Sequence, residues 1–240
     1  MGLINIKEIT LPIYRILSFD KLVDIFKKQE LTLVKPSNWE DPFENCILKS
    51  FTIDKDGYET YHGNRDDLYG QCWTSRKDSD AMWRIYSPDK SGVKIKSTVE
   101  KILTNLVESV GIENAFIGKV EYRSKKYILG QMKETWNSKL IYQGNDVIEN
   151  IVKTLLIKRK AFSHESEIRV IYFSLNSKPE SDIHPVKIDP FQLVVEIAFD
   201  PRINPNKLAA YQHYLKNEIK FLGKINKSPL YDAPSHKIRI

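Results

Sequence analysis

The sequence lacks the features that mark secreted, zinc-binding and membrane-spanning proteins. Its only two cysteines, Cys46 and Cys72, cannot make a disulfide framework or a zinc site. Its apolar runs are short, and none approaches the roughly 18 residues that a membrane-spanning helix needs. Its first residues do not follow the pattern of a signal peptide. We therefore expect a cytoplasmic protein with free thiols and no membrane partner.

Motifs of the common enzyme classes are missing as well. The chain has no P-loop, GxGxxG, HExxH or GxSxG pattern. Its histidines show no spacing typical of metal ligands; they are His62, His164, His184, His213 and His236. Metal-dependent hydrolysis therefore has little support, and we expect no bound metal.

What is present is the composition of a folded, basic protein. The 240 residues are 41% hydrophobic and 28% charged, which is typical of one large domain spanning 1–240. The net charge of +6 permits an anionic partner such as a nucleotide or a nucleic acid. The basic residues are spread along the chain, so charge alone supports the prediction of nucleic-acid binding only modestly.

The spacing of apolar residues predicts a mixture of strands and helices. Alternating or continuous apolar residues predict strands at 12–17, 30–36, 71–75, 92–97, 115–122, 167–174 and 192–199. The last of these is nearly continuous in apolar residues, so we expect a central strand buried on both faces. Helical spacing predicts helices at 19–28, 98–109 and 145–160, a short one capped by Asp78 or Ser79, and a long one from Asn204-Pro205. Because strands and helices do not alternate strictly, we predict an α+β fold with a mixed, mostly antiparallel sheet and peripheral helices.

Several short segments follow one another in a distinctive order and spacing. They are Tyr14-Arg15, Ser37 with Asp41-Pro42-Phe43, Met82-Trp83 with Tyr86, Gly92-Val93, and Lys158, Phe162, Glu165, Glu167 and Arg169. Together they resemble the bacterial and phage family called domain of unknown function 2971. That family has a basic-aromatic pair before a helix, Ser-x-x-x-Asp-Pro-Phe, Met-Trp-x-x-Tyr before a Gly-Val strand, and Lys-x-x-x-(Trp/Phe)-x-x-Glu-x-Glu-x-Arg. The similarity covers about 12–220, although Ser-Pro-Asp follows Tyr86 where the family often has an Ala-x-x-His-like turn.

Each of these segments also has a purely structural interpretation. Asp-Pro-Phe is commonly a tight turn with a buried aromatic anchor, and Met82, Trp83 and Tyr86 have the spacing of a core-packing helix face. On this basis we expect Trp83 and Phe43 to be largely buried. Glu167 and Arg169 lie two apart on a predicted strand, so they share a face and can simply pair with each other.

Taken together, the segments resemble the Arg–Ser–Glu layout of ADP-ribosyltransferases. In that chemistry NAD loses nicotinamide through an oxocarbenium-like transition state, and a carboxylate is wanted beside the ribose. The resemblance implies Glu165 and Glu167 as catalytic residues, an arginine that holds a phosphate or ribose, and an aromatic ring for nicotinamide. The implied NAD-binding residues are Tyr14, Arg15, Thr74, Ser75, Trp83 and Tyr86. A nucleic acid or protein acceptor, and a role in phage defence, are implied in the same way.

Two other functions remain open from the sequence. The protein could be a non-enzymatic module that binds a nucleic acid, nucleotide or other small ligand through a basic surface, or a purely structural partner. An enzyme would bring Arg15, Ser75 and one glutamate around one cleft, whereas a binding module would leave the glutamates in surface ion pairs.

The two glutamates are expected to differ. Glu167 is predicted inside the strand, and Glu165 at its beginning, more exposed to a ligand. Both side chains should project to one face, with Ile168, Val170 and Tyr172 on the other.

Overall fold

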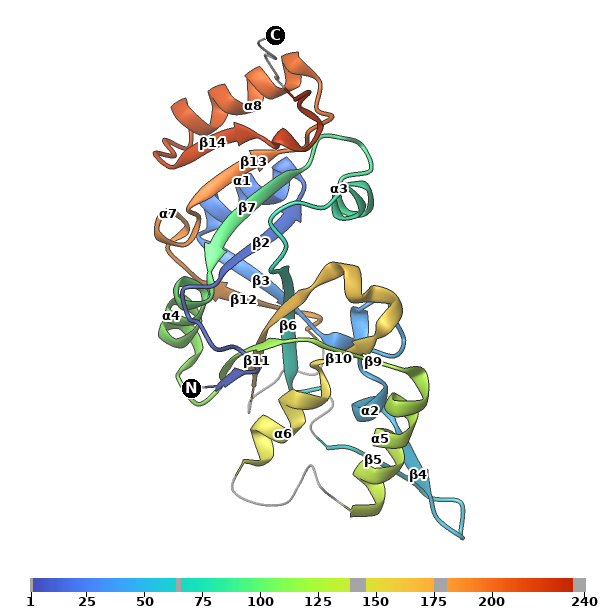
Figure 1. Cartoon of the computed structure of the whole chain (residues 1–240). Helices are drawn as coiled ribbons and strands as arrows, with labels where there is room; N and C mark the ends of the chain where they lie inside the picture. The colour runs from blue at the N-terminus through green and yellow to red at the C-terminus, as the bar shows by residue number, and fades with distance from the viewer. Residues whose placement is uncertain (1, 64–65, 139–145, 175–180, 235–240) are drawn as a thin grey trace.

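The structure is a computed structural model that describes residues 2–63, 66–138, 146–174 and 181–234. Its core is one large sheet, shown in Figure 1. The strands of this sheet are β1 (Gly2–Ile4), β2 (Pro12–Leu17), β3 (Glu30–Val34), β6 (Leu68–Thr74), β7 (Val93–Thr98), β8 (Ala115–Lys119), β11 (Glu167–Phe173), β12 (Ile183–Lys187), β13 (Glu196–Phe199) and β14 (Lys224–Lys227). Two smaller sheets pair β4 (Phe51–Ile53) with β5 (Glu59–Tyr61), and β9 (Glu121–Arg123) with β10 (Ile157–Arg159).

The large sheet divides into two branches at β6. Its strand order is β1-β8-β11-β6-β2-β7-β13-β14, and β3, followed by β12, also pairs with β6. Thr74 of β6 pairs with Tyr14 of β2, whereas Gly70 of β6 pairs with Val34 of β3. Within the large sheet, β1 with β8 and β13 with β14 are parallel pairs, and the other described pairs are antiparallel. The predicted α+β fold with a mixed, mostly antiparallel sheet is confirmed.

The helices lie around this sheet (Figure 1). They are α1 (Phe19–Lys28), α2 (Cys46–Lys49), α3 (Asp80–Tyr86), α4 (Val99–Val110), α5 (Lys125–Ser138), α6 (Val147–Thr154), α7 (Pro190–Leu193) and α8 (Pro205–Asn217), with short 3-10 turns η1 (Pro36–Asn38), η3 (Lys160–Glu165) and η4 (Pro229–Tyr231). The expected helix at 19–28 is confirmed, and the Ser18 hydroxyl caps it by accepting from the Lys21 backbone N–H at 3.3 Å. None of the helices in the described part of the chain is long and apolar enough to cross a membrane.

Two hydrophobic clusters lie on opposite faces of the sheet. The larger one packs α1, α4, α7 and α8 against residues such as Ile95 and Val170. The smaller one packs α2 and α6 against Ile171 and Phe173, which alternate with Val170 along β11. In the β2-β7-β13 branch, the face opposite the larger cluster carries polar residues. This face continues into the functional site described below.

Two predicted elements differ from the structure. The first is the predicted strand at 192–199. Its first residues belong to the short helix α7, which Asp189 caps, so the strand begins only at Glu196. This shorter strand, β13, pairs with β7 and β14. Of the predicted helix at 145–160, residue 145 lies outside the described residues and α6 ends at Thr154. The chain then turns into β10 because Ile157–Arg159 pair with β9, a long-range contact that helical spacing does not reveal.

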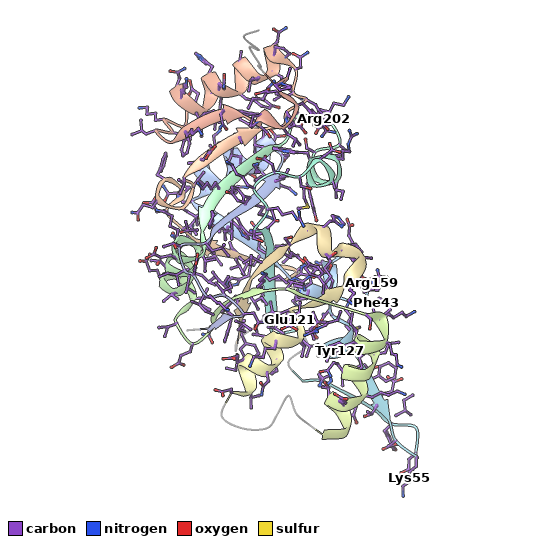
Figure 2. All side chains as sticks on the ribbon, in the orientation of Figure 1. Phe43, Lys55, Glu121, Tyr127, Arg159 and Arg202 are labelled. Carbon is purple, nitrogen blue, oxygen red and sulfur yellow. The ribbon has the colours of Figure 1, made fainter. Side chains whose placement is uncertain are left out.

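The molecule is elongated. Figure 2 places Lys55 at the tip of the β4–β5 hairpin, at one extremity, and Arg202 toward the other end, beside α3. Arg202 holds the C-terminal end of α3, since its Nη2 donates to the carbonyl oxygens of Trp83 and Ser87, both at 3.0 Å. The branch point of the sheet lies between these extremities, where strands of both halves meet (Figure 1).

Candidate functional site

Three neighbouring strands bring predicted site residues into one row at the branch point. Tyr14 of β2 pairs with Thr74 of β6, and Thr74 pairs on its other side with Glu167 of β11. Directly paired residues point to the same face of a sheet, so the three side chains form a row across the junction. All three are buried. Segments that lie about 60 and 90 residues apart in the sequence therefore meet here, which strand periodicity alone cannot show.

The turn before β11 positions Glu165. The strand begins at Glu167, as predicted, and Glu165 is the last residue of η3, so strand alternation does not set the direction of the Glu165 side chain as expected. Ser166 between them adopts a left-handed conformation with φ 47°. The Thr74 hydroxyl donates to the Glu165 carbonyl oxygen at 2.5 Å, and the Ser75 hydroxyl donates to the Ser166 carbonyl oxygen at 3.0 Å. Thr74 and Ser75 thus fix the turn that carries Glu165.

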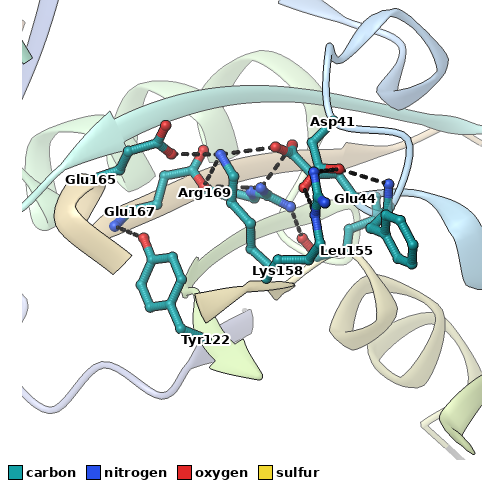
Figure 3. Close-up of polar contacts among 10 residues, drawn as sticks. Asp41, Glu44, Tyr122, Leu155, Lys158, Glu165, Glu167 and Arg169 are labelled. Atoms are coloured by element: carbon teal, nitrogen blue, oxygen red, sulfur yellow. Dashed lines mark hydrogen bonds and ion pairs between the residues drawn. The ribbon is translucent and has the colours of Figure 1, made fainter. Parts of the chain in front are cut away.

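Both glutamates belong to a buried group of five charged side chains, which we call the charge cluster. Its members are Glu44, Lys158, Glu165, Glu167 and Arg169 (Figure 3). Lys158 Nζ lies 2.5 Å from Glu165 Oε2, 2.8 Å from Glu44 Oε1 and 3.5 Å from Glu167 Oε2. Arg169 Nη2 lies 2.9 Å from both Glu44 Oε2 and Glu167 Oε2. Three carboxylates thus share two cations inside the protein.

The expected difference in exposure between the glutamates is wrong. Glu165 is 6% exposed and Glu167 is 4% exposed. Their partners differ instead. Glu167 is held by both Arg169 and Lys158, and its backbone N–H donates to the Tyr122 hydroxyl at 2.8 Å. Glu165 is held through Oε2 by Lys158, and no described residue donates a hydrogen bond to its Oε1. Glu165 therefore has the carboxylate oxygen that is open to a further partner.

The surroundings shift the pKa values of two acids of the charge cluster, Glu44 and Glu167, in opposite directions. Burial raises the pKa of Glu44 above its usual range, although Arg169 and Lys158 counteract part of this. Burial acts in the same direction on Glu167, but there Arg169 and Lys158 outweigh it and hold the pKa of the carboxyl below its usual range. Burial opposes the charged form of Lys158, yet Glu167, Glu165 and Glu44 together raise its pKa. Glu167 and Lys158 are therefore charged at neutral pH.

Two tyrosines and a thiol surround the cluster without carrying charge. Burial raises the pKa of Tyr122 to about 12, and burial together with the nearby Glu165 raises that of Tyr86. Burial also raises the pKa of Cys72 well above its usual value, helped by the negative charge of Glu167. These groups stay protonated at neutral pH and can act as hydrogen-bond donors near the carboxylates.

Arg15 lies next to this site without joining the charge cluster. Burial lowers the pKa of Arg15, and the ionisable groups of Cys72 and Tyr86 act in the opposite direction, so both lie within electrostatic reach. Cys72 and Tyr86 in turn lie near Glu167 and Glu165. No hydrogen bond or ion pair links Arg15 to either glutamate within the described ranges. Arg15 and the glutamates are thus neighbours through shared partners.

The predicted aromatic residues of α3 have different environments. Trp83 is 1% exposed, as expected, and its ring lies 5.5 Å from Lys94 Nζ, which is also 5.5 Å from the Tyr14 ring. Tyr86 is 45% exposed, so a ligand can reach its ring. The expectation that Phe43 is largely buried is wrong. Phe43 is half-buried, and the Arg159 guanidinium carbon lies 4.8 Å from the centre of its ring.

Several site residues were not predicted from the sequence. Glu44 follows Asp-Pro-Phe, Tyr122 ends a predicted strand, and Lys94 alternates with the core residues of β7. Single polar residues at such places are usually exposed, and only the long-range contacts of this fold bury them. No group of three or more potential metal ligands occurs in the described part of the chain.

Comparison with known proteins gives one family and several solved structures. A search of curated proteins finds no match. The structure of Thermus sp. 2.9 DarT in complex with carba-NAD+ covers 92% of this chain and 97% of its own, with 12% identity and a TM-score of 0.41. Thermus sp. 2.9 DarT in complex with NAD+ covers 93% and 98%, with 11% identity and a TM-score of 0.42. The same enzyme in complex with ADP-ribosylated ssDNA covers 95% and 98%, with 11% identity and a TM-score of 0.43.

The family match falls on the central part of the chain. The profile described as "Protein of unknown function (DUF2971)" matches residues 82–170. This stretch contains Trp83, Tyr86, Glu165 and Glu167. The resemblance of the sequence to the DUF2971 family is therefore confirmed over residues 82–170.

Proposed function

We propose that this protein is an ADP-ribosyltransferase-like enzyme that uses NAD. The observation that carries the proposal is the row of Tyr14, Thr74 and Glu167 on three adjacent strands, with Glu165 tied to Thr74 through its carbonyl oxygen. This arrangement supports the Arg–Ser–Glu layout that the sequence resembles. It gathers the basic-aromatic pair in the middle of β2, the hydroxyl-bearing end of β6 and the glutamate pair at one junction.

In the proposed reaction, the bond between C1′ of the ribose and the nicotinamide nitrogen breaks. Nicotinamide leaves with the electron pair, and positive charge develops at C1′ and the ring oxygen. A nucleophilic atom of the acceptor then bonds to C1′ and loses its proton to a base. A carboxylate fixed beside the ribose stabilises the developing charge and accepts a hydrogen bond from the 2′-hydroxyl.

Glu165 is the glutamate that we assign to the ribose. Its Oε2 is fixed by Lys158 at 2.5 Å, while Oε1 accepts no hydrogen bond from any residue that the structure describes. Glu167 is a positioning residue in this proposal, because Arg169 and Lys158 already occupy it. In this proposal Tyr86, which is 45% exposed, stacks on nicotinamide, and Arg15 holds a phosphate or ribose. A nucleic acid or protein acceptor and a role in phage defence are parts of the proposal that rest on the family resemblance, and a cytoplasmic location is a part that rests on the composition of the sequence.

The test is nicotinamide release from NAD by the purified chain, with single-stranded DNA, RNA and protein offered as acceptors. Glu165→Gln keeps the shape of the side chain and removes its charge, so we expect a loss of rate of about 10²-fold or more with little change in stability. Glu167→Gln should lower both rate and stability, since Arg169 would lose one of its two buried counter-charges. Glu108→Gln, an exposed change on α4, is the matched control and should alter neither.

Two results would count against the proposal. One is the absence of nicotinamide release by the wild-type protein with every acceptor. The other is a Glu165→Gln variant that turns over NAD as fast as the Glu108→Gln control.

The ion pairs of the glutamates favour a second candidate function. A protein that binds a nucleotide without turnover could keep Glu165 and Glu167 permanently paired with Lys158, purely for stability. Such a protein would bind NAD or ADP, and its Glu165→Gln variant would bind equally well. Binding without nicotinamide release would select this alternative.

A further inference from the structure

A pocket lined by lysines lies beside the site described above. Its volume is about 340 Å³, and it opens on the polar face of the β2-β7-β13-β14 branch. It is lined by Tyr14, Lys77, Asp78, Lys94, Lys96, Glu196, Ala198, Lys224, Asn226, Ser228 and Pro229. We call it the lysine pocket. Tyr14 belongs to both the lysine pocket and the row of Tyr14, Thr74 and Glu167, so the two are continuous.

The two acids of the pocket already form ion pairs with two of its lysines. Lys94 Nζ lies 2.6 Å from Asp78 Oδ1, and Lys224 Nζ lies 3.5 Å from Glu196 Oε1. Glu196 Oε1 also accepts from the Asn226 side-chain amide at 3.0 Å. Four lysines against two acids leave a surplus of two positive charges in the lining.

The surplus falls on Lys77 and Lys96. Neither has an ion pair with any residue that the structure describes, whereas Lys94 and Lys224 have one each. Lys96 pairs across the sheet with Tyr14 on one side and with Glu196 on the other, which places it in the middle of the polar face. Lys77 lies at the rim and is exposed. Both residues therefore line the same concave surface.

The lining fits the diphosphate group of a nucleotide. Ammonium groups donate charge-assisted hydrogen bonds to phosphate oxygens, and the Tyr14 hydroxyl is a further potential donor at the wall. Ligand pockets commonly measure about 300–1,000 Å³, and the lysine pocket lies at the small end of this range. It would therefore hold about half of a dinucleotide. Ala198 presents only a methyl group to the pocket, which leaves room near the sheet.

We propose that the lysine pocket binds a nucleoside diphosphate, with Lys96 and Lys77 holding the phosphates. That this ligand is one half of NAD rests on the proposed function. In that case Tyr14 lies between the diphosphate in the lysine pocket and the ribose that Glu165 would face. A nucleoside diphosphate can bind in the lysine pocket whether or not the protein turns over NAD, so binding and catalysis can be tested separately.

The binding experiment uses isothermal titration calorimetry of the full chain with ADP and with adenosine at low salt. The wild type should bind ADP more tightly than adenosine, because only ADP carries phosphates. Lys96→Gln should raise the Kd for ADP by about tenfold, the value of one charge-assisted hydrogen bond, and Lys77→Gln with it should raise the Kd further. Lys96→Arg should retain much of the affinity. Lys216→Gln, which removes one exposed lysine from α8, is the matched control and should leave the Kd unchanged.

Equal affinities for ADP and adenosine would overturn the proposal. So would a Lys216→Gln variant that weakens ADP binding as much as Lys96→Gln does. If the wild type releases nicotinamide from NAD, the KM for NAD should rise in Lys96→Gln while kcat stays, and an unchanged KM would also overturn the pocket assignment. Lys96-dependent ADP binding without any NAD turnover would support the pocket and contradict the transferase function.

Discussion

Ser166 determines where the two glutamate carboxylates lie relative to each other. With φ 47° it turns the chain between η3 and β11, so that Glu165 and Glu167 reach the same Lys158 although only Glu167 is in a strand. A non-glycine residue in the left-handed region costs about 1–3 kcal/mol and persists only where its surroundings fix it. Here Ser75 and Arg76 fix it, because Ser75 donates to the Ser166 carbonyl oxygen and Arg76 Nε donates to its hydroxyl at 2.9 Å.

Lys158 is the residue on which the charge cluster depends most. Replacing Lys158 by Met leaves Glu44, Glu165 and Glu167 with Arg169 as the only buried cation of the charge cluster, and removing one partner of a buried ion pair costs about 3–5 kcal/mol. We therefore expect a loss of that size in urea melts at about pH 7. Lys153→Met, which removes an exposed partner of Glu149 on α6, is the control and should change stability by less than about 0.5 kcal/mol.

The loss should shrink as the pH falls. The pKa of Lys158 is raised in the folded wild type, so its contribution is complete below the usual lysine value and constant between neutral and mildly acidic pH. Without Lys158 the pKa values of Glu44 and Glu167 rise, and the folded state then binds more protons than the unfolded state. Stability of the variant relative to wild type should therefore improve from about pH 7 toward about pH 4.5, near the usual glutamate pKa. A deficit that does not depend on pH would argue against buried carboxylates as its cause.

Among the elements, α3 links the polar face of the sheet to the site. Ser79 begins this helix by accepting from the Met82 backbone N–H at 3.4 Å, and Met82 and Trp83 are its buried residues. One turn later Tyr86 is exposed beside the charge cluster. The helix was predicted from the sequence because its cap and its apolar spacing are local features. The contacts of Trp83 were not predictable, since Lys94, which lies near its ring, and Arg202, which donates to its carbonyl oxygen, come from other parts of the chain.

Trp83→Ala should destabilise the protein by about 3–5 kcal/mol, as large-to-small changes in a core do. Trp83 is 1% exposed and Arg202 bonds to its carbonyl oxygen, so the helix has little freedom to close the cavity. Ile85→Ala on the same helix is the control; Ile85 is 52% exposed, and its replacement should change stability by less than about 1 kcal/mol. An unchanged urea midpoint for Trp83→Ala would contradict the buried position of this ring.

At the scale of the whole molecule, the branch at β6 joins the two parts of the sheet. The pairing of Tyr14 with Thr74 is the only β2–β6 register pair within the described residues, and Thr74 is also the residue that bonds to the turn before β11. The charge cluster lies on one side of this junction and the lysine pocket on the other. A ligand that spans both would contact the β11 side of β6 and the β2-β7-β13-β14 branch together.

Thr74→Val tests this junction with almost no change in shape. The Thr74 hydroxyl donates to the Glu165 carbonyl oxygen and accepts from the Arg76 backbone N–H at 3.0 Å. Valine leaves both groups without this partner, which should cost about 1–3 kcal/mol. Thr60→Val on the exposed β4–β5 hairpin is the matched control and should be near neutral. Urea melts of the two variants give the comparison, and equal midpoints would mean that the Thr74 hydroxyl does not hold the junction.

The sequence by itself determined the local elements, the mixed and mostly antiparallel sheet, and the identity of the glutamate and hydroxyl segments. Caps, apolar periodicity and strand alternation act over a few residues, so Ser18, Ser79 and the alternation in β11 could be recognised directly. Only the tertiary structure decided that Ser166 turns the chain between the two glutamates, that both are buried, and that Lys158 joins them to Glu44. These features depend on contacts between residues up to 125 positions apart, and local spacing contains no information about which distant side chains will share a low-dielectric interior.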